Sequence, residues 1–124
     1  MGRAAGGPHM KRLALLLMLL PAQVQAQAAS FEDFFGPFRA AVLAGDAKAI
    51  RAHTRLPFLF QGRMLDASGF EAAVPALFDP PTQACFRKPE LVDYGGSRQI
   101  FCQGSIYIFA DDGGWKFIEI GVDD

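Results

Sequence analysis

The clearest pattern of hydrophobic and polar positions lies between residues 98 and 122, where two apolar runs flank a short polar segment. The segment is Asp111-Asp112-Gly113-Gly114, and Asp-Gly between apolar runs is a strong signal for a tight β-hairpin. The pattern therefore predicts two antiparallel strands, Gln99–Ala110 and Trp115–Val122.

The register of this hairpin decides which side chains enter the core, because alternate residues of a strand point to opposite faces. A symmetric turn centred on Asp112-Gly113 pairs Ala110 with Trp115 and Ile106 with Glu119. One face is then almost wholly apolar, and we expect it to line a pocket beneath the helices with residues of an earlier strand: Phe58, Phe60, Ile106, Ile108, Trp115, Phe117 and Glu119. The opposite face is the expected partner surface, formed by Tyr107, Phe109, Ile118 and Ile120.

Helical periodicity dominates the stretch after residue 30. Apolar residues recur at helical spacing from Phe31 to Val42, and Ser30 is suited to be the N-cap. Gly36-Pro37 interrupts this run, so the helix either kinks there or restarts. Gly45 is the expected end of the helix, and Asp46 is expected to cap a short second helix that reaches about His53.

The middle of the chain mixes both periodicities. Leu56–Gln61 predicts a strand that Gly62 ends, with residues 63–65 continuing extended. Ser68 to Glu71 has the spacing of a capping box and predicts a helix, whereas residues 82–86 are ambiguous. Leu91–Tyr94 predicts a short strand. The order is helix, helix, strand, helix and three antiparallel strands, which predicts an α+β domain with helices packed on a curved antiparallel sheet of about four strands.

The N-terminal segment has the composition of a secretory signal peptide. Lys11-Arg12 precedes the apolar run Leu13–Leu20, and Val24-Gln25-Ala26 follows as a small-residue cleavage site. The run is far shorter than the ~20 residues that span a bilayer. We therefore expect residues 1–26 to be an extension and signal peptide, and residues 27–124 to be a single exported domain, periplasmic or secreted, with no membrane attachment after cleavage. An uncleaved anchor is the alternative.

Charge argues against a nucleic-acid partner. Removing Arg3, Lys11 and Arg12 from the 12 basic residues leaves nine against 13 acidic ones, a net charge near −4. The chain contains no Lys/Arg run, and its 12 Phe residues fall at apolar-periodic positions.

The two cysteines, Cys85 and Cys102, are interpreted through the predicted export. An oxidising compartment permits a disulfide between them, which would stabilise the fold by about 3 kcal/mol in the loop-entropy model. Two buried free thiols are the alternative. A metal site is not expected, because neither cysteine has a histidine nearby.

Four segments of the chain resemble the nuclear transport factor 2-like superfamily, which includes ketosteroid isomerases. They are Phe38–Asp46, Leu56–Gly62, the Ser68-Gly-Phe70 to Leu77-Phe78 helix, and Gly113-Gly-Trp-Lys-Phe-Ile118. The resemblance implies a cone-shaped α+β (cystatin-like) fold in a small exported member, and dimerisation through the sheet. The aspartate base and oxyanion pair of the isomerases match no positions here, so no catalytic residue is carried over.

Glu119 is the single candidate for catalysis. On the apolar face its charged form would be desolvated, which suits a general acid or base; the alternative is a Glu that pairs with Arg or Tyr or reaches water. His53 is expected to be solvated or to cap a helix. Arg55 and Arg63 flank the Phe-rich strand and either hold an anion at a pocket mouth or are ordinary surface arginines.

These observations give three hypotheses. The first is a small exported binding domain, non-catalytic and without a cofactor, with a Phe-lined pocket for a small apolar ligand and a homodimer formed through the sheet. The second is an isomerase- or hydrolase-like enzyme that uses Glu119. The third is a structural or inhibitory module that binds a protein partner through the outer sheet face.

Overall fold

The computed structural model describes residues 30–122, so the predicted signal peptide lies outside the described residues. Within that range none of the helices has the length and apolar character needed to cross a membrane. The elements follow the order α3 (Phe31–Ala44), α4 (Ala47–Ala52), β1 (Phe58–Phe60), β2 (Arg63–Leu65), α5 (Ala67–Leu77), α6 (Pro80–Arg87), β3 (Leu91–Tyr94), β4 (Ser97–Cys102), β5 (Ser105–Asp111) and β6 (Trp115–Val122).

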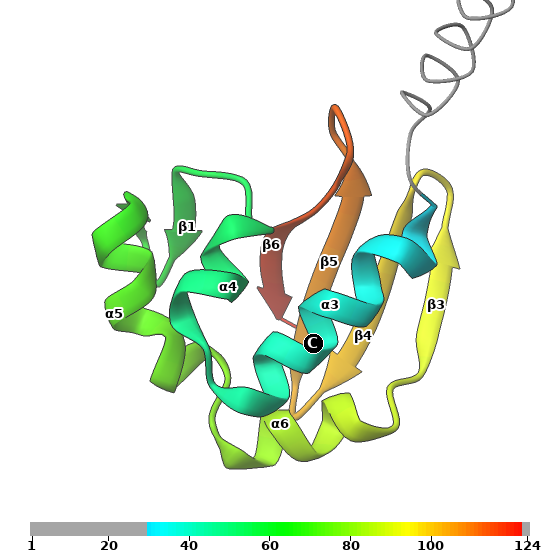
Figure 1. Cartoon of the computed structure of the whole chain (residues 1–124), viewed down its shortest axis with the longest axis horizontal. Helices are drawn as coiled ribbons and strands as arrows, with labels where there is room; N and C mark the ends of the chain where they lie inside the picture. Colours follow the sequence, from blue (N-terminus) through cyan, green and yellow to red (C-terminus); the bar gives the residue numbers. More distant parts are fainter. Residues whose placement is uncertain (1–29, 123–124) are drawn as a thin grey trace, which may run out of the picture.

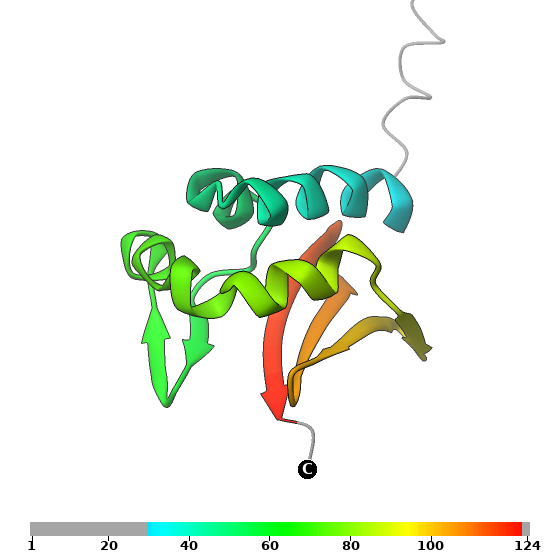
Figure 2. The same ribbon diagram turned by 90° about the horizontal axis from the view of Figure 1, so that it is seen from below.

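The fold is α+β, as the sequence predicts. Strands β3, β4, β5 and β6 form one antiparallel sheet in that order, and β1 and β2 form a separate two-stranded sheet. Helices α3 and α6 run across one face of the four-stranded sheet, and the β1–β2 hairpin lies with α5 on the side of β6 (Figures 1 and 2). The helices therefore cover one sheet face and leave the other uncovered.

Helix α3 confirms most of its sequence signals. The Ser30 hydroxyl accepts from the Asp33 backbone N–H and the Asp33 carboxylate accepts from the Ser30 N–H, which makes a capping box. The helix continues through Gly36-Pro37 without restarting. It ends at Gly45, whose φ of 65° is the left-handed conformation that glycine adopts without strain.

The middle of the chain confirms one expectation and corrects another. The strand ends before Gly62 and residues 63–65 are extended, as expected, and they return antiparallel to β1 as β2, through a turn at Gln61-Gly62. The N-cap of helix α5 is Asp66, two residues before Ser68, which was the expected N-cap. The Asp66 carboxylate accepts a hydrogen bond from the Gly69 N–H at 2.8 Å. The ambiguous residues 82–86 belong to α6.

The expected strand Gln99–Ala110 is in fact two strands. The chain reverses at Gln103-Gly104, where φ values of 55° and 78° fit a two-residue hairpin turn. Strands β4 and β5 flank this turn, with Cys102 opposite Ser105 and Phe101 opposite Ile106. The four-stranded sheet is complete without the residues 56–61 that the sequence assigned to it.

The predicted register between the last two strands was also wrong. The turn holds three residues, because Asp111 pairs with Trp115 and its carboxylate accepts from the Gly114 N–H at 2.9 Å. This shifts β5 by one residue, so Phe109 lies opposite Phe117. A bulge then places Ile108 opposite Glu119. Since one residue of slip exchanges the faces of a strand, the core side of β5 is the reverse of the expected one.

The core is built from phenylalanine. Phe117 has its ring centroid between 4.9 and 6.5 Å from those of six aromatic neighbours: Phe38, Phe58, Phe70, Phe78, Tyr107 and Phe109. Phe86 and Ile100 are also fully buried. Aromatic rings at these separations add favourable pair contacts to the area that they bury. The space between helices and sheet is thus filled with side chains.

A disulfide joins Cys85 of α6 to Cys102 at the end of β4, which confirms the expected pairing. The two residues are 17 positions apart, and their Cα atoms lie 6.1 Å from each other. The bond therefore fixes a helix of the covering layer to the sheet beneath it.

Candidate functional site

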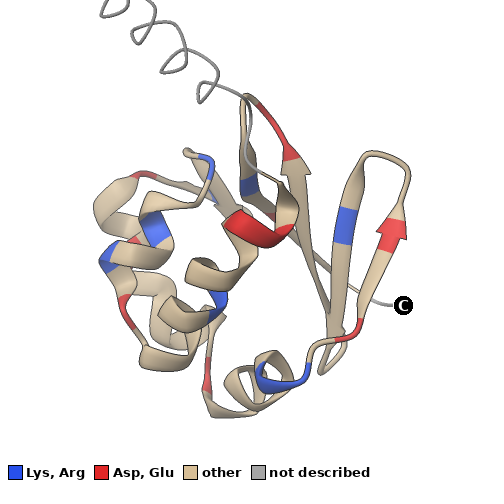
Figure 3. Cartoon of the chain, turned by 45° about the vertical axis from the view of Figure 1, so that its right-hand side comes forward, with Lys and Arg blue, Asp and Glu red and all other residues tan. Residues whose placement is uncertain are grey.

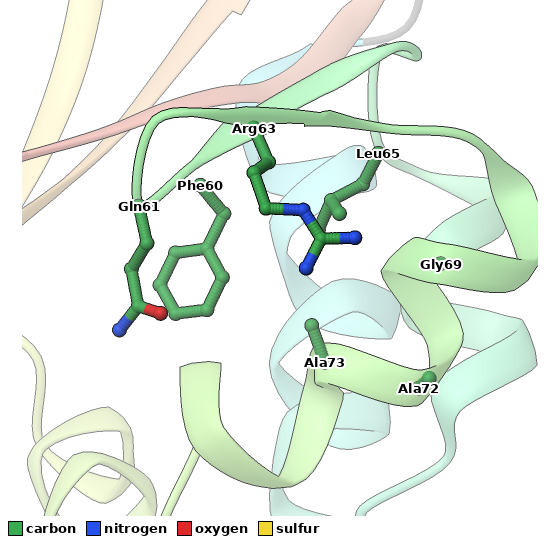
Figure 4. Close-up of a pocket in the computed structure, with 7 residues that line it drawn as sticks. All are labelled: Phe60, Gln61, Arg63, Leu65, Gly69, Ala72 and Ala73. Carbon is green, nitrogen blue, oxygen red and sulfur yellow. The ribbon is translucent and has the colours of Figure 1, made fainter.

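A pocket of about 310 Å³ lies between the tip of the β1–β2 hairpin and α5. Its lining comes from these two elements and the turn between β1 and β2, and Figure 4 shows the side chains grouped around it: Phe60, Gln61, Arg63, Leu65, Gly69, Ala72 and Ala73. Ligand pockets typically range from about 300 to 1,000 Å³. This pocket is at the lower limit, which suits a small molecule.

The register of the hairpin creates one wall of the pocket. Phe60 pairs with Arg63 and Phe58 with Leu65, so these four side chains share one face of the hairpin. Phe58 is buried in the core, whereas Phe60 and Leu65 are half-buried nearer the tip. The same face thus passes from core at its base to pocket at its tip.

The turn at the tip adds a polar side chain. Gln61 has φ 52° and Gly62 has φ 76°, the two positive values of a type I′ turn. Asn is the usual non-glycine residue in such a position, and glutamine is a less favourable one. Figure 4 shows the Gln61 amide beside the Phe60 ring at the pocket.

Helix α5 forms the opposite wall, and its small residues leave the space open. Ala72 and Ala73 reach no further than a methyl group. A Cβ on Gly69 would lie 3.2 Å from the Asp66 carboxylate and 3.5 Å from Leu65, so a larger residue there would press on the helix cap. The pocket depends on this absence of large side chains along one side of the helix.

Arg63 is the one charged residue that lines the pocket. Within residues 30–122 its guanidinium makes no ion pair and no hydrogen bond to protein, and Figure 4 shows it extended over the pocket. The acids of α5 have other partners: Glu71 pairs with Arg51, and Asp66 accepts from Gly69 and Ser68. The hydrogen bond from the Gly69 N–H has the larger effect, and together with the one from Ser68 it lowers the pKa of Asp66. Arg63 is therefore an exposed cation at the pocket without a carboxylate paired to it among the described residues.

Charges elsewhere in the described chain are mostly paired or dispersed. Figure 3 shows Lys and Arg distributed over the helices, the hairpin and the sheet among acidic residues. Arg98 lies within 4.0 Å of both Glu32 and Asp93 and stacks over the Phe31 and Trp115 rings. Arg55, the other arginine that flanks the Phe-rich strand, pairs with Asp112 at 3.4 Å. Of the two flanking arginines, only Arg63 lies at a pocket.

The residues expected to line a pocket are separated by the structure. Phe60 lines it, whereas Phe58 and Phe117 are buried in the core. Ile106 and Ile108 lie on the uncovered sheet face, opposite Gly121 and Glu119. Trp115 is half-buried and packs edge-to-face with Phe31 at 5.0 Å.

Glu119 lies on the uncovered sheet face and is exposed to solvent, so the expectation that it enters the apolar core was wrong. The physical reason is the bulge after Phe117, which rotates Glu119 outward. A carboxylate in this position is solvated and lies outside the pocket.

The expected partner surface is divided in the same way. Tyr107 and Phe109 are buried beneath the helices, and Ile118 and Ile120 are half-buried. Burial raises the pKa of the Tyr107 phenol, which donates a hydrogen bond to the Leu77 carbonyl at 2.5 Å. The side chains on the uncovered face are instead those of the neighbouring positions, among them Val92, Phe101, Ile106 and Ile108.

His53 has a structural place. It is the C-cap of α4, its carbonyl accepts from the Phe117 N–H at 2.9 Å, and its ring packs against Phe34 and Phe38. Among the described residues no cluster of three or more His, Cys, Asp or Glu side chains has the arrangement of a metal site.

Comparison with known proteins gives no relative: no family model, curated protein or solved structure matches the chain. The chemistry of the pocket therefore has to be argued from its own residues.

Proposed function

We propose that this protein is a small exported binding domain that holds a small, mainly apolar ligand in the pocket between the β1–β2 hairpin and α5, without catalysing a reaction. The observation that carries the proposal is the pocket itself. Its walls include a phenylalanine, a leucine and two alanines, and Gln61 and Arg63 supply the polar side chains of the lining. Convergent apolar walls with a few polar groups are the common form of a ligand site.

The lining also favours binding over chemistry. None of the seven lining residues has a carboxylate, imidazole, thiol or hydroxyl, the groups that usually act as acids, bases or nucleophiles. Glu119, the one candidate for a general acid or base, is exposed on the sheet face. The geometry favours no enzyme mechanism at this site.

Ligand binding at the pocket is tested by comparing the original protein with a variant in which the pocket is filled. The experiment uses the predicted mature protein, residues 27–124, which contains every element of the described fold. Hexan-1-ol and hexanoate are titrated while backbone amide shifts are recorded by NMR. We expect shifts to gather at Gln61, Gly69 and Ala73, and Ala72→Leu to abolish them by filling the space.

Ala84→Leu is the matched control, because Ala84 is an exposed alanine of α6 that does not line the pocket. It should leave binding unchanged. Failure of both probes to shift pocket amides, or equal binding by Ala72→Leu and the original protein, would overturn the proposal.

A second surface supports a homodimer. The uncovered sheet face carries Phe101 and Val92, which are 38% and 36% exposed, next to Ile106 and Ile108. Apolar side chains gathered on one face are typical of interaction surfaces. We propose that two copies associate through this face. Sedimentation at micromolar concentration should give a dimer that Phe101→Asp converts to monomer, and a monomeric original protein would exclude it.

Two further parts of the proposal come from the sequence. Export is supported by the signal-peptide pattern and by the Cys85–Cys102 disulfide, which an oxidising compartment maintains. Membership of the nuclear transport factor 2-like superfamily is supported by the four sequence segments and by helices packed on an antiparallel sheet. Detection of residues 27–124 outside the cytoplasm, with a new N-terminus near Ala26, tests export.

A further inference from the structure

We propose that the ligand of this pocket is a small carboxylate with an apolar body, whose charged group lies against Arg63. This inference rests on the proposed function and names its ligand class. Three features of the hairpin tip support it: the direction of Arg63, the state of the neighbouring acids, and the apolar side chains that line the pocket with Arg63.

The position of Arg63 is set by the strand register. Arg63 is opposite Phe60 and two residues before Leu65. Its side chain therefore lies on the same face of the hairpin as the apolar side chains of Phe58, Phe60 and Leu65. On the opposite face of the hairpin lie Leu59 and Met64, which are 53% and 61% exposed. The cation thus stands on the pocket side and two apolar side chains stand on the solvent side, the reverse of the usual alternation.

The protein itself supplies no anion for this cation in the part of the chain that the structure describes. Glu71 is held by Arg51 at 2.5 Å, and Asp66 caps α5. A guanidinium has five N–H donors in a planar fork that matches a carboxylate, and a bidentate pair is among the stronger polar contacts. Arg63 is exposed, so its guanidinium is open to an anionic ligand that enters the pocket.

The rest of the pocket argues against a small inorganic anion as the ligand, because the remaining lining is largely apolar. Around Arg63 the walls are the Phe60 ring, Leu65 and the methyl group of Ala73, as Figure 4 shows. The Gln61 amide at the edge can donate to a second carboxylate oxygen. A volume of about 310 Å³ accommodates a short aliphatic or aromatic acid. Phosphate would leave the apolar walls unfilled.

The test compares three probes on the mature protein: hexanoate, hexan-1-ol and inorganic phosphate. We expect hexanoate to bind at least about tenfold more tightly than hexan-1-ol, because a hydrogen bond to a charged group contributes that much or more. Phosphate should bind more weakly than hexanoate. Added salt should weaken the binding of hexanoate but not of hexan-1-ol.

Substitutions locate the effect. Arg63→Gln should weaken hexanoate binding at least about tenfold and leave hexan-1-ol binding unchanged, and Arg63→Lys should have an intermediate effect, since lysine keeps the charge but loses the fork. Arg87→Gln is the control, because it removes the same charge from an exposed position of α6 outside the pocket. Thermal unfolding of each variant confirms that it is folded.

The outcomes separate the two proposals. Equal affinity for hexanoate and hexan-1-ol at the pocket, or an unchanged hexanoate affinity in Arg63→Gln, overturns the carboxylate and keeps the binding domain. Phosphate affinity equal to that of hexanoate overturns the apolar body. Absence of pocket shifts with all three probes overturns both the ligand class and the proposed function.

Discussion

The substitution Phe109→Ala tests the sheet face that the sequence assigned wrongly. Phe109 is fully buried, and its ring contacts those of Phe31, Phe34, Phe35, Phe38 and Phe117 at centroid distances of 5.3–6.1 Å. Removing a buried phenylalanine costs about 3–5 kcal/mol, the transfer energy of the ring plus the cavity that it leaves. For a domain of this size, each kcal/mol lowers the melting temperature by about 4–8 °C. We therefore expect a fall of at least about 12 °C.

Phe101→Ala is the matched control, because the same atoms are removed from the uncovered face of the same sheet, where Phe101 is 38% exposed. We expect it to cost about 1 kcal/mol or less when unfolding is measured at a protein concentration low enough to keep the chain monomeric, since Phe101 is then not packed on all sides. Unfolding by urea can be followed through the single tryptophan, Trp115, which packs against Phe31. A larger loss of stability in Phe101→Ala than in Phe109→Ala would refute the observed register.

Three further predictions concern the disulfide, a buried tyrosine and a helix cap. Replacing Cys85 and Cys102 together by alanine should lower the free energy of unfolding by about 3 kcal/mol, measured in urea without reductant; an unchanged midpoint would contradict it. Burial raises the pKa of Tyr107, so the folded state holds the phenol proton more tightly than the unfolded chain. This contribution to stability is present below the pKa of tyrosine in the unfolded chain, near 10, and is lost as pH rises through the higher pKa of Tyr107 in the folded state. Between pH 8 and 11 the urea midpoint should therefore fall less in Tyr107→Phe than in the original protein. Asp66→Ala should destabilise the fold more than Ser68→Ala, because Asp66 holds the cap. Because the pKa of Asp66 is lowered in the folded state, its contribution to stability is lost as acid protonates the carboxylate. The urea midpoint of Asp66→Ala should therefore vary less with pH below pH 4 than that of the original protein.

The sequence predicted the elements whose signals are local. Ser30 and Gly45 bound a helix by capping chemistry that involves only neighbouring residues, and the periodicity of its phenylalanines agrees with the face that is buried. Leu91–Tyr94 and Trp115–Val122 were predicted with the observed bounds. Such signals need no knowledge of the rest of the fold.

The errors arose where two local signals compete. Gln103-Gly104-Ser105 interrupts the apolar residues of Gln99–Ala110 and turns the chain there, but glutamine at positive φ is not a common turn signal. The three-residue turn after Asp111 and the bulge at Ile118 each shift the register by one, which no alternation pattern reveals. Glu119 was misplaced for this reason.

The pocket was predictable only in part. Arg63 and Phe60 were recognised as residues of interest because they flank or belong to a Phe-rich strand. Gly69, Ala72 and Ala73 carry no chemical signal, since their contribution is the space that they leave. Residues 63–65 were predicted to be extended after a break at Gly62, but the antiparallel pairing that turns Arg63 toward α5 was not predicted. The local sign of the turn was Gly62 between two short apolar runs, because glycine adopts positive φ without strain.

Phe117 has a consequence for the order in which the molecule can form. Its ring is at the centre of the aromatic core, and its backbone N–H and C=O bond to His53 and Arg55, more than 60 positions earlier in the chain. Contacts so distant in sequence form late and slow the search for the native state. During synthesis the helices and the hairpin have no completed core to pack against until β6 has been made. The native core can therefore close only after nearly the whole chain has been made, because its central residue lies in the last strand.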